Sequence, residues 1–253
     1  MKIGIIGAMS EEITLLHDII SVDKKNVFAD RTFYEGKINN IEVVLVQAKI
    51  GKIAAAITTS LLLTKYDVDA VIFTGVAGAV SDELNIGDII IAHDLMQHDM
   101  DASPIFPKYQ IPLLETASID TSKVLTEQLK KAAADFTKNG LNQEIPDHLL
   151  CELSITAPKI VCGTIVSGDQ FVKDQDVITR IRQDIPNAKC VEMEGAAVAQ
   201  VCYEFNKPFA IMRVISDKAD HSANVDFSKF LQVASHYSRG IINNLFKSEQ
   251  DLL

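Results

Sequence analysis

Three carboxylates follow the ends of short apolar runs, where their side chains would face a ligand. Glu12 comes after the first apolar run of the chain, Glu194 after a short run near residue 190, and Asp217 after the last run. Ligands of open α/β sheets bind beyond the carboxyl ends of the strands. If the three ends converge, the pocket offers acid–base groups and hydrogen-bond acceptors. Such a pocket suits an uncharged polyol, or a ligand whose positive charge grows in the transition state.

Each of these acids also has a purely structural interpretation. Glu11 and Glu12 would lie in the first turn of a helix, where carboxylates interact favourably with the helix dipole. Glu194 opens another helix, and Asp217 could cap a turn after its strand. The residue types by themselves leave both interpretations open.

The other polar motifs match no standard site. The loop that contains Gly75 and Gly78 lacks the Lys-Ser/Thr pair of a P-loop and the G-x-G-x-x-G pattern, so a nucleotide-phosphate site is disfavoured. Residues 98–101 offer one His and two Asp, but no second cluster has matching spacing, and we predict no metal. Neither Ser167 nor Ser216 lies in a G-x-S-x-G nucleophile elbow.

The elements that must position these residues alternate between short apolar runs and amphipathic stretches. This alternation predicts βαβ units and an α/β fold with a largely parallel sheet. The expected strands are 2–6, 33–37, 41–47, 70–73, 88–92, 159–166, 190–192 and 209–215, with a hairpin turn at 39–40. The expected helices are 10–20, 52–63, 122–136, 177–184, 195–205 and 227–246. No linker divides the chain, so 1–253 is predicted to be one domain, with 140–158 as a surface loop.

Composition and charge exclude several classes of protein. The chain has 253 residues, 47% of them hydrophobic and 23% charged, which is typical of a globular protein. With 24 Lys and Arg against 34 Asp and Glu, its net charge of −10 leaves no basic footprint for nucleic acid. No apolar run approaches the ~18 residues of a membrane span, and the apolar start is too short for a signal peptide. The four cysteines show no C-x-x-C spacing and are expected to be reduced and buried in a cytoplasmic protein.

Motifs that occur in order along nearly the whole chain resemble those of bacterial 5′-methylthioadenosine/S-adenosylhomocysteine nucleosidases. They are 1–12 (MKIGIIGAMSEE), 51–55 (GKIAA), 74–78 (TGVAG), 167–171 (SGDQF), 191–195 (VEMEG) and 213–217 (RVISD). The resemblance implies a nucleoside phosphorylase-like fold, a single-domain three-layer α/β sandwich with a mixed, largely parallel central sheet. It also implies a homodimer without a cofactor that hydrolyses the N-glycosidic bond of methylthioadenosine, S-adenosylhomocysteine and related nucleosides such as 5′-deoxyadenosine, as in methionine salvage.

The resemblance assigns roles to the residues at matching positions. Glu12 would activate the attacking water as general base, and Asp217, beside Ser216, would hold a proton and donate it to adenine N7. Glu194 would accept hydrogen bonds from the ribose hydroxyls. The other implied substrate contacts are Ser167, Phe171 stacked on adenine, the backbone of Val172 at the adenine edge, Met193 and Arg213 beside Glu194, and Met9, Ile50 and Phe227 around the sugar and its 5′ substituent.

An apolar loop is implied to complete the site of a partner subunit. Residues 98–112 resemble the stretch that reaches the neighbouring 5′ pocket, with Ile105, Phe106 and Pro112 as its apolar candidates. Packing of this loop on its own domain is the alternative. The chain departs from the family pattern at Val76, where some relatives carry Ser, and in the length of the predicted surface loop.

Three other functions share parts of this pattern. A phosphorylase of the same fold would need cationic groups for phosphate, but no Arg occurs between Arg31 and Arg180, and Glu11 and Glu12 would repel the anion. Hydrolysis of 6-amino-6-deoxyfutalosine would apply the same mechanism to another 5′ substituent. A nucleoside sensor would need the binding contacts but neither the base nor the acid. The sequence therefore favours an adenine nucleoside hydrolase.

Overall fold

The computed structural model describes residues 1–219 and 223–247. The strands are β1 (Lys2–Gly7), β2 (Ser21–Phe28), β3 (Arg31–Ile38), β4 (Ile41–Gln47), β5 (Ala70–Phe73), β6 (Val76–Ala79), β7 (Ile89–Gln97), β8 (Ser118–Asp120), β9 (Ile160–Ser167), β10 (Ala188–Glu192) and β11 (Phe209–Asp217). The helices are α1 (Ser10–Ile13), α2 (Lys52–Thr64), α3 (Lys123–Asp135), α4 (Leu141–Glu144), α5 (Asp147–Glu152), α6 (Gln175–Asp184), α7 (Gly195–Glu204) and α8 (Ala223–Lys247). A 3₁₀ turn (Thr14–Asp18) continues α1, and a π-helical turn (Phe136–Gly140) continues α3.

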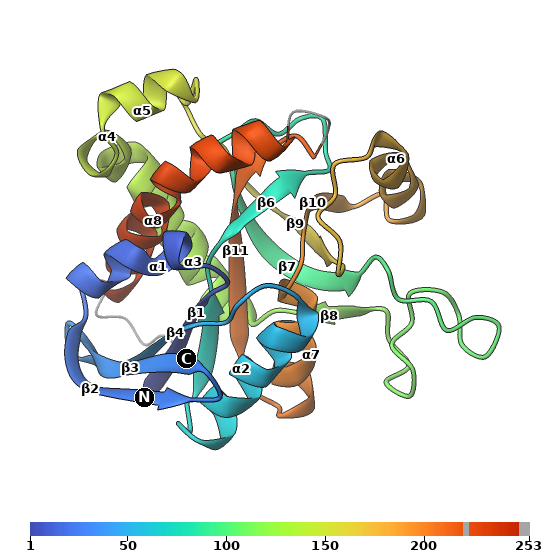
Figure 1. Ribbon diagram of the computed structural model, residues 1–253, viewed down its shortest axis with the longest axis horizontal. Coiled ribbons are helices and arrows are strands. Elements are labelled where there is room, and N and C mark those ends of the chain that lie inside the picture. Colours follow the sequence, from blue (N-terminus) through green and yellow to red (C-terminus); the bar gives the residue numbers. More distant parts are fainter. Residues whose placement is uncertain (220–222, 248–253) are drawn as a thin grey trace.

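The strands form one mixed sheet in the order β2-β3-β4-β1-β5-β11-β6-β10-β9-β7-β8. Its centre is parallel, because β1 pairs in this way with β4 and β5, and β11 with β5 and β6. β7 is parallel to β9 on one side and antiparallel to β11 on the other. The pairings β11–β6–β10–β9–β7–β11 therefore close on themselves, which brings strands that are distant in the sequence to one end of the molecule (Figure 1).

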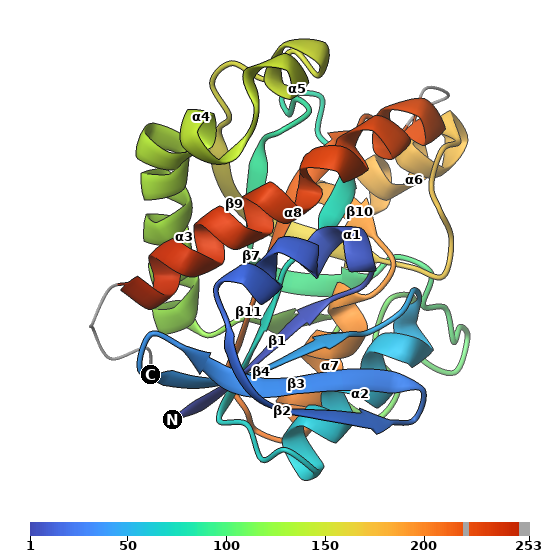
Figure 2. The same cartoon turned by 60° about the vertical axis from the view of Figure 1, so that its left-hand side comes forward.

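Helices cover both faces of the sheet, which makes the fold a three-layer sandwich (Figures 1 and 2). One hydrophobic core lies under α1, α3 and α8, and a second lies under α2 and α7. Successive side chains of a strand point to opposite faces. Accordingly, Val43 and Leu45 of β4 lie in the first core, whereas Val44 and Val46 lie in the second.

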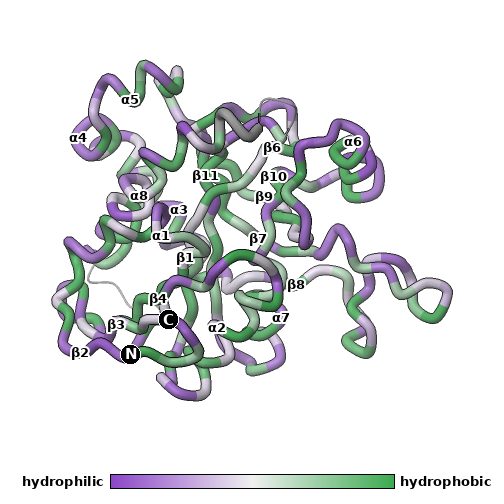
Figure 3. Tube along the Cα trace, in the orientation of Figure 1, coloured by the Kyte–Doolittle hydropathy of each residue, from purple (hydrophilic) through white to green (hydrophobic). Residues whose placement is uncertain are grey.

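Burial on both faces explains why the central strands are continuous apolar runs in the sequence. Every residue of β5 and β11 is buried, and Figure 3 shows largely hydrophobic traces for β7 and β11. Within residues 1–219 and 223–247, none of the helices combines the length and the apolar character that a bilayer-spanning segment requires.

Most of the expected elements are confirmed, with boundaries that differ by a few residues. The predicted hairpin joins β3 and β4 antiparallel, and Asn39 has the left-handed backbone that such a turn favours. The helix expected over 10–20 is shorter, because α1 ends at Ile13 and continues as a 3₁₀ turn. Three strands were not predicted: β2 is largely polar and exposed, while β6 and β8 are only four and three residues long.

The prediction of a surface loop over 140–158 is wrong. This segment forms α4 and α5, and its side chains extend the first core. Leu141, Ile145 and Leu150 are buried there. The two prolines of the segment misled the prediction, since Pro146 precedes α5 at its N-cap rather than breaking a helix.

The prediction that all four cysteines are buried is wrong for two of them. Cys190 and Cys202 lie in the core, but Cys151 on α5 and Cys162 near the start of β9 are exposed. All four are free thiols, as expected. The first residues of β9 are only partly covered, so an apolar run in the sequence did not ensure burial at position 162.

Candidate active site

A cavity of about 370 Å³ lies beyond the carboxyl ends of β1, β10 and β11, and its size is that of a small-molecule site. Segments from both halves of the sheet and the start of α8 meet around it. The predicted site residues that line it are Met9, Glu12, Ile50, Phe171, Val172, Met193, Glu194, Ser216, Asp217 and Phe227. The convergence of the three acids that the sequence suggested is therefore observed.

Glu12 is a buried carboxylate held at both oxygens. It is the third residue of α1, and its Oε2 accepts a hydrogen bond of 2.9 Å from the backbone N–H of Met9, as in a capping box. Its Oε1 accepts one of 3.0 Å from the backbone N–H of Val76. Burial raises the pKa of Glu12, against the opposing effects of Arg213 and the backbone donors. A carboxylate whose proton affinity is raised in this way is a better general base than one in water.

Gly75 and Gly78 leave room for two carboxylates. A Cβ on Gly75 would lie 2.8 Å from Oε1 of Glu12, and a Cβ on Gly78 would lie 2.9 Å from Oδ1 of Asp217. Both distances are well inside van der Waals contact. The glycine-rich segment thus makes room for two acids at the cavity.

Asp217 is the last residue of β11 and is buried beside the cavity. Its Oδ2 accepts a hydrogen bond of 2.8 Å from the hydroxyl of Ser216, and its Oδ1 accepts one of 2.8 Å from the backbone N–H of Ala219. These contacts orient the carboxyl group while the residue still lines the cavity.

Glu194 immediately precedes α7 and reaches across the cavity to the segment between β4 and α2. Its Oε1 accepts a hydrogen bond of 2.7 Å from the backbone N–H of Gly51. Gly51 has a φ of +97°, a conformation that favours glycine. Burial and the nearby charge of Glu192 raise the pKa of Glu194, and they outweigh the opposing effects of Gly51 and Arg213.

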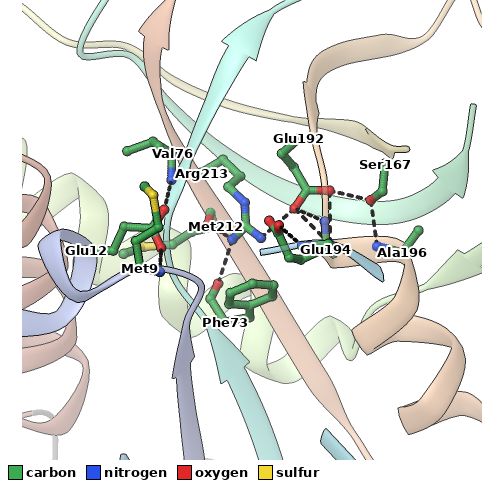
Figure 4. A network of polar contacts seen from close by, with 12 residues as sticks. Met9, Glu12, Phe73, Val76, Ser167, Glu192, Glu194, Ala196, Met212 and Arg213 are labelled. Carbon is green, nitrogen blue, oxygen red and sulfur yellow. Dashed lines mark hydrogen bonds and ion pairs between the residues drawn. The ribbon is translucent and has the colours of Figure 1, made fainter. Parts of the chain in front are cut away.

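A buried ion pair joins Arg213 to Glu192, a residue that lines the cavity (Figure 4). Nη2 of Arg213 lies 2.7 Å from Oε2 of Glu192, and the guanidinium carbon lies 4.0 Å from the centroid of the Phe73 ring. Burial opposes the charge of Arg213, but the surrounding glutamates raise its pKa overall. Figure 4 shows this guanidinium between Glu12 and Glu194. One fixed positive charge thus balances several acids without itself lining the cavity.

Ser167 belongs to the support of that ion pair rather than to the cavity lining. Its hydroxyl donates to Glu192 and accepts a hydrogen bond of 2.7 Å from the backbone N–H of Ala196. Glu192 also accepts from the backbone N–H of Gly195. The end of β9 and the start of α7 are therefore joined through one carboxylate.

The other side of the cavity is apolar and aromatic. Phe171 and Phe227 meet edge to face, with ring centroids 5.6 Å apart and an interplanar angle of 76°. Met9 and Ile50 line the same cavity. Flat rings and a thioether provide surface for a purine and an apolar substituent, whereas the carboxylates face the polar part of a ligand.

Some predicted site residues lie elsewhere. Arg213 and Ser167 are buried behind the wall, and Ile105, Phe106 and Pro112 belong to a loop that projects away from the rest of the chain (Figure 1). Glu192 lines the cavity but was not singled out, although its position at the end of a predicted strand, two residues before another acid, was a signal.

Asp99 and Asp101 of the segment 98–101 form polar contacts within the protein. Nζ of Lys52 lies 2.7 Å from Asp99, and Asp101 accepts hydrogen bonds from Ser103. Among the described residues, no group of three or more His, Cys, Asp or Glu is arranged to hold a metal ion.

Comparisons with known proteins point to one family. The model of the phosphorylase superfamily matches residues 2–247. A 5′-methylthioadenosine/S-adenosylhomocysteine nucleosidase from Glaesserella parasuis is 41% identical over 96% of both chains. The crystal structure of the corresponding nucleosidase from Neisseria meningitidis, in complex with methylthio-immucillin-A, is similar with a TM-score of 0.86, 33% identity, and coverage of 98% of this chain and 99% of that one. The futalosine hydrolase of Helicobacter pylori is similar with a TM-score of 0.82, 33% identity and 97% coverage of both chains.

Proposed function

This chain belongs to the phosphorylase superfamily, and from that premise we propose that it is an N-glycosyl hydrolase acting on 5′-methylthioadenosine and S-adenosylhomocysteine. Its products are adenine and the ribose that carries the 5-substituent. The close similarity to nucleosidases over nearly the whole chain supports this substrate class. The cavity supports it too, since its aromatic side fits adenine and its acids fit the ribose and the reacting bond.

The observation that carries hydrolysis, rather than phosphorolysis, is the charge of the cavity. Glu12, Glu192, Glu194 and Asp217 line it, while no Lys or Arg does so among the described residues. The nearest buried cation, Arg213, is already paired with Glu192. A phosphate ion needs cationic or strong N–H donors, and this arrangement repels it. Water is therefore the nucleophile that the site accepts.

In the proposed reaction, the bond between C1′ of the ribose and N9 of adenine breaks. Glu12 takes a proton from the water whose oxygen forms the new bond to C1′. The electron pair of the broken bond stays with adenine, and Asp217 delivers a proton to N7. General acid and base catalysis contribute roughly 10²–10⁴-fold each.

Glu194 acts on the sugar. Breaking the glycosidic bond builds positive charge on the ribose ring, and a carboxylate that accepts hydrogen bonds from the ribose hydroxyls favours that charge. The contact with Gly51 fixes one oxygen of Glu194 and leaves the other for a hydroxyl. Arg213 positions the surrounding acids rather than contacting substrate.

Chromatographic detection of adenine tests this function. Wild-type protein is incubated with methylthioadenosine in phosphate-free buffer and again with added phosphate, next to Glu12→Gln and Asp217→Asn. We expect equal release of adenine in both buffers and a loss of about 10²–10⁴-fold in either variant. Formation of a ribose 1-phosphate would overturn hydrolysis, and intact nucleoside after long incubation with wild type would indicate a sensor.

Futalosine hydrolysis is the second candidate, because a futalosine hydrolase is among the similar structures. The reacting groups would be the same, and only the 5′ substituent would differ. Comparing kcat/KM for methylthioadenosine, S-adenosylhomocysteine and 6-amino-6-deoxyfutalosine separates the two. A clear preference for the last would make it the main substrate.

We further propose that the protein is a homodimer. Ile53 and Ile57 lie on one face of α2, next to Ile50, and are exposed by 75% and 43%. In the projecting loop, Ile105 and Leu113 are exposed by 82% and 84%. Apolar surface of this kind indicates an interface, and a loop of the partner could then complete the 5′ side of the cavity. Full activity in a species of monomeric mass at micromolar concentration would contradict this.

We also propose that the protein is located in the cytoplasm. The free cysteines agree with a reducing compartment.

A further inference from the structure

A second, polar cavity of about 270 Å³ adjoins the first. It lies between α1, β3 and the end of β4. Met9 and Ile50 line the first cavity, and their chain neighbours Ser10 and Lys49 line the second. Two backbone segments thus form a rim that the cavities share.

A charge pair stands at this rim. Lys49 and Asp30 form an ion pair, and their side chains are exposed by 45% and 92%. Both residues line the second cavity. The pair therefore presents a positive and a negative group, side by side, to a ligand that leaves the first cavity past Ile50.

The backbone conformation at Lys49 is consistent with a functional role for its side chain. Its φ is +71°, a left-handed conformation that is uncommon for residues other than glycine. Such outliers are often retained where a side chain serves a function. On the opposite side, Ala29 and Asp30 form a tight turn with positive φ, which Arg31 supports through a 2.7 Å hydrogen bond to the carbonyl of Ala29.

We propose that this second cavity binds the amino-acid end of S-adenosylhomocysteine, with Lys49 contacting its carboxylate and Asp30 its ammonium group. The inference rests on the proposed function, with the 5′ substituent on the apolar side of the first cavity, which Met9 and Ile50 line. The homocysteine chain continues from that point by its sulfur and methylene groups and ends in one negative and one positive group. Methylthioadenosine ends in a methyl group at the sulfur and does not reach the rim.

This arrangement makes Lys49 a residue that distinguishes the two substrates. Arg31 also lines the cavity and adds a buried positive charge to it, which favours a ligand that carries a carboxylate. Because the contact is exposed to solvent, its contribution is modest, about fivefold in kcat/KM. The reacting bond is remote from the rim, so the effect falls on KM.

The test compares Lys49→Met, Lys49→Arg and Asp30→Asn with wild type on three substrates: S-adenosylhomocysteine, methylthioadenosine, and an S-adenosylhomocysteine analogue that lacks the carboxylate. Methionine keeps the Cβ and the length of the side chain, so the backbone demand at position 49 is unchanged. We expect Lys49→Met to lower kcat/KM about fivefold for S-adenosylhomocysteine, through KM, and to leave the other two substrates unaffected. Lys49→Arg should keep the wild-type kcat/KM for S-adenosylhomocysteine. Asp30→Asn should lower kcat/KM for both substrates that carry the ammonium group.

Two results would overturn the inference without touching the proposed function. One is an equal loss for S-adenosylhomocysteine and methylthioadenosine in Lys49→Met, which indicates a structural role. The other is a wild-type kcat/KM for S-adenosylhomocysteine in Lys49→Met, which indicates that Lys49 does not contact the substrate. Failure of wild type to cleave either nucleoside would overturn the proposed function as well.

Discussion

Replacing Gly75 with alanine tests whether the position of Glu12, and not merely its presence, controls the reaction. The new Cβ would lie 2.8 Å from Oε1 of Glu12 and 3.4 Å from Nη1 of Arg213. Both neighbours are buried, and Glu12 is held by two backbone donors. The carboxylate must therefore give way against its own hydrogen bonds.

The magnitude follows from those contacts. Restoring an ordinary contact with the Cβ moves Oε1 by about 0.5 Å, which stretches the 3.0 Å bond from Val76 to the limit of a hydrogen bond. A hydrogen bond to a charged group contributes about 1.5–3 kcal/mol. A loss of this size in the transition state lowers kcat about 10–100-fold.

Steady-state kinetics of adenine release from methylthioadenosine measures this change, with KM expected to stay near the wild-type value. Gly140→Ala is the matched control, because the three atoms nearest to its Cβ all belong to Phe136, which does not line the cavity, and its kcat should equal that of wild type. A wild-type kcat in Gly75→Ala, together with an inactive Glu12→Gln, would show that the exact position of the Glu12 carboxylate does not control the reaction.

Three further predictions concern charge and burial. Burial raises the folded-state pKa of Glu12 above its ordinary value of 4.5, so protonation of this group favours the folded state. The stabilisation is therefore present below about pH 4.5 and is lost as the pH rises through the folded-state pKa. Urea unfolding should therefore show Glu12→Gln gaining stability relative to wild type as pH rises from about 4 to about 8, and a constant difference would contradict the shift. Glu192→Gln should lower the unfolding free energy by about 3–5 kcal/mol, since it leaves Arg213 buried without its ion pair, and a change equal to that of an exposed control such as Glu42→Gln would refute this. Iodoacetamide should modify the exposed Cys151 and Cys162 in the native protein. It should modify Cys190 and Cys202 only after denaturation, because these two thiols are buried and burial raises their pKa. Mass spectrometry identifies the modified cysteines, and rapid labelling of Cys190 in the native protein would contradict the structure.

Much of the fold was predictable because burial on both faces produces continuous apolar strands. The hairpin at 39–40 and α2 were predicted from local pattern alone. By contrast, the segment 140–158 was misread, because turn residues such as Pro146 look alike whether they end a helix or precede one. Short strands such as β6 carry too few residues for a period to be recognised.

The sequence by itself determined which acids stand at the ends of the strands and that no Arg between Arg31 and Arg180 is available to meet a phosphate. Those facts depend on residue type and on local pattern, which the chain order carries directly. Only the tertiary structure decided that Glu194 faces the cavity while Glu192 holds Arg213, and that Gly75 and Gly78 make space for carboxylates. These outcomes depend on side-chain direction and on contacts between segments far apart in the chain, because pairings such as β7 with β11 bring the segments together only when the sheet closes.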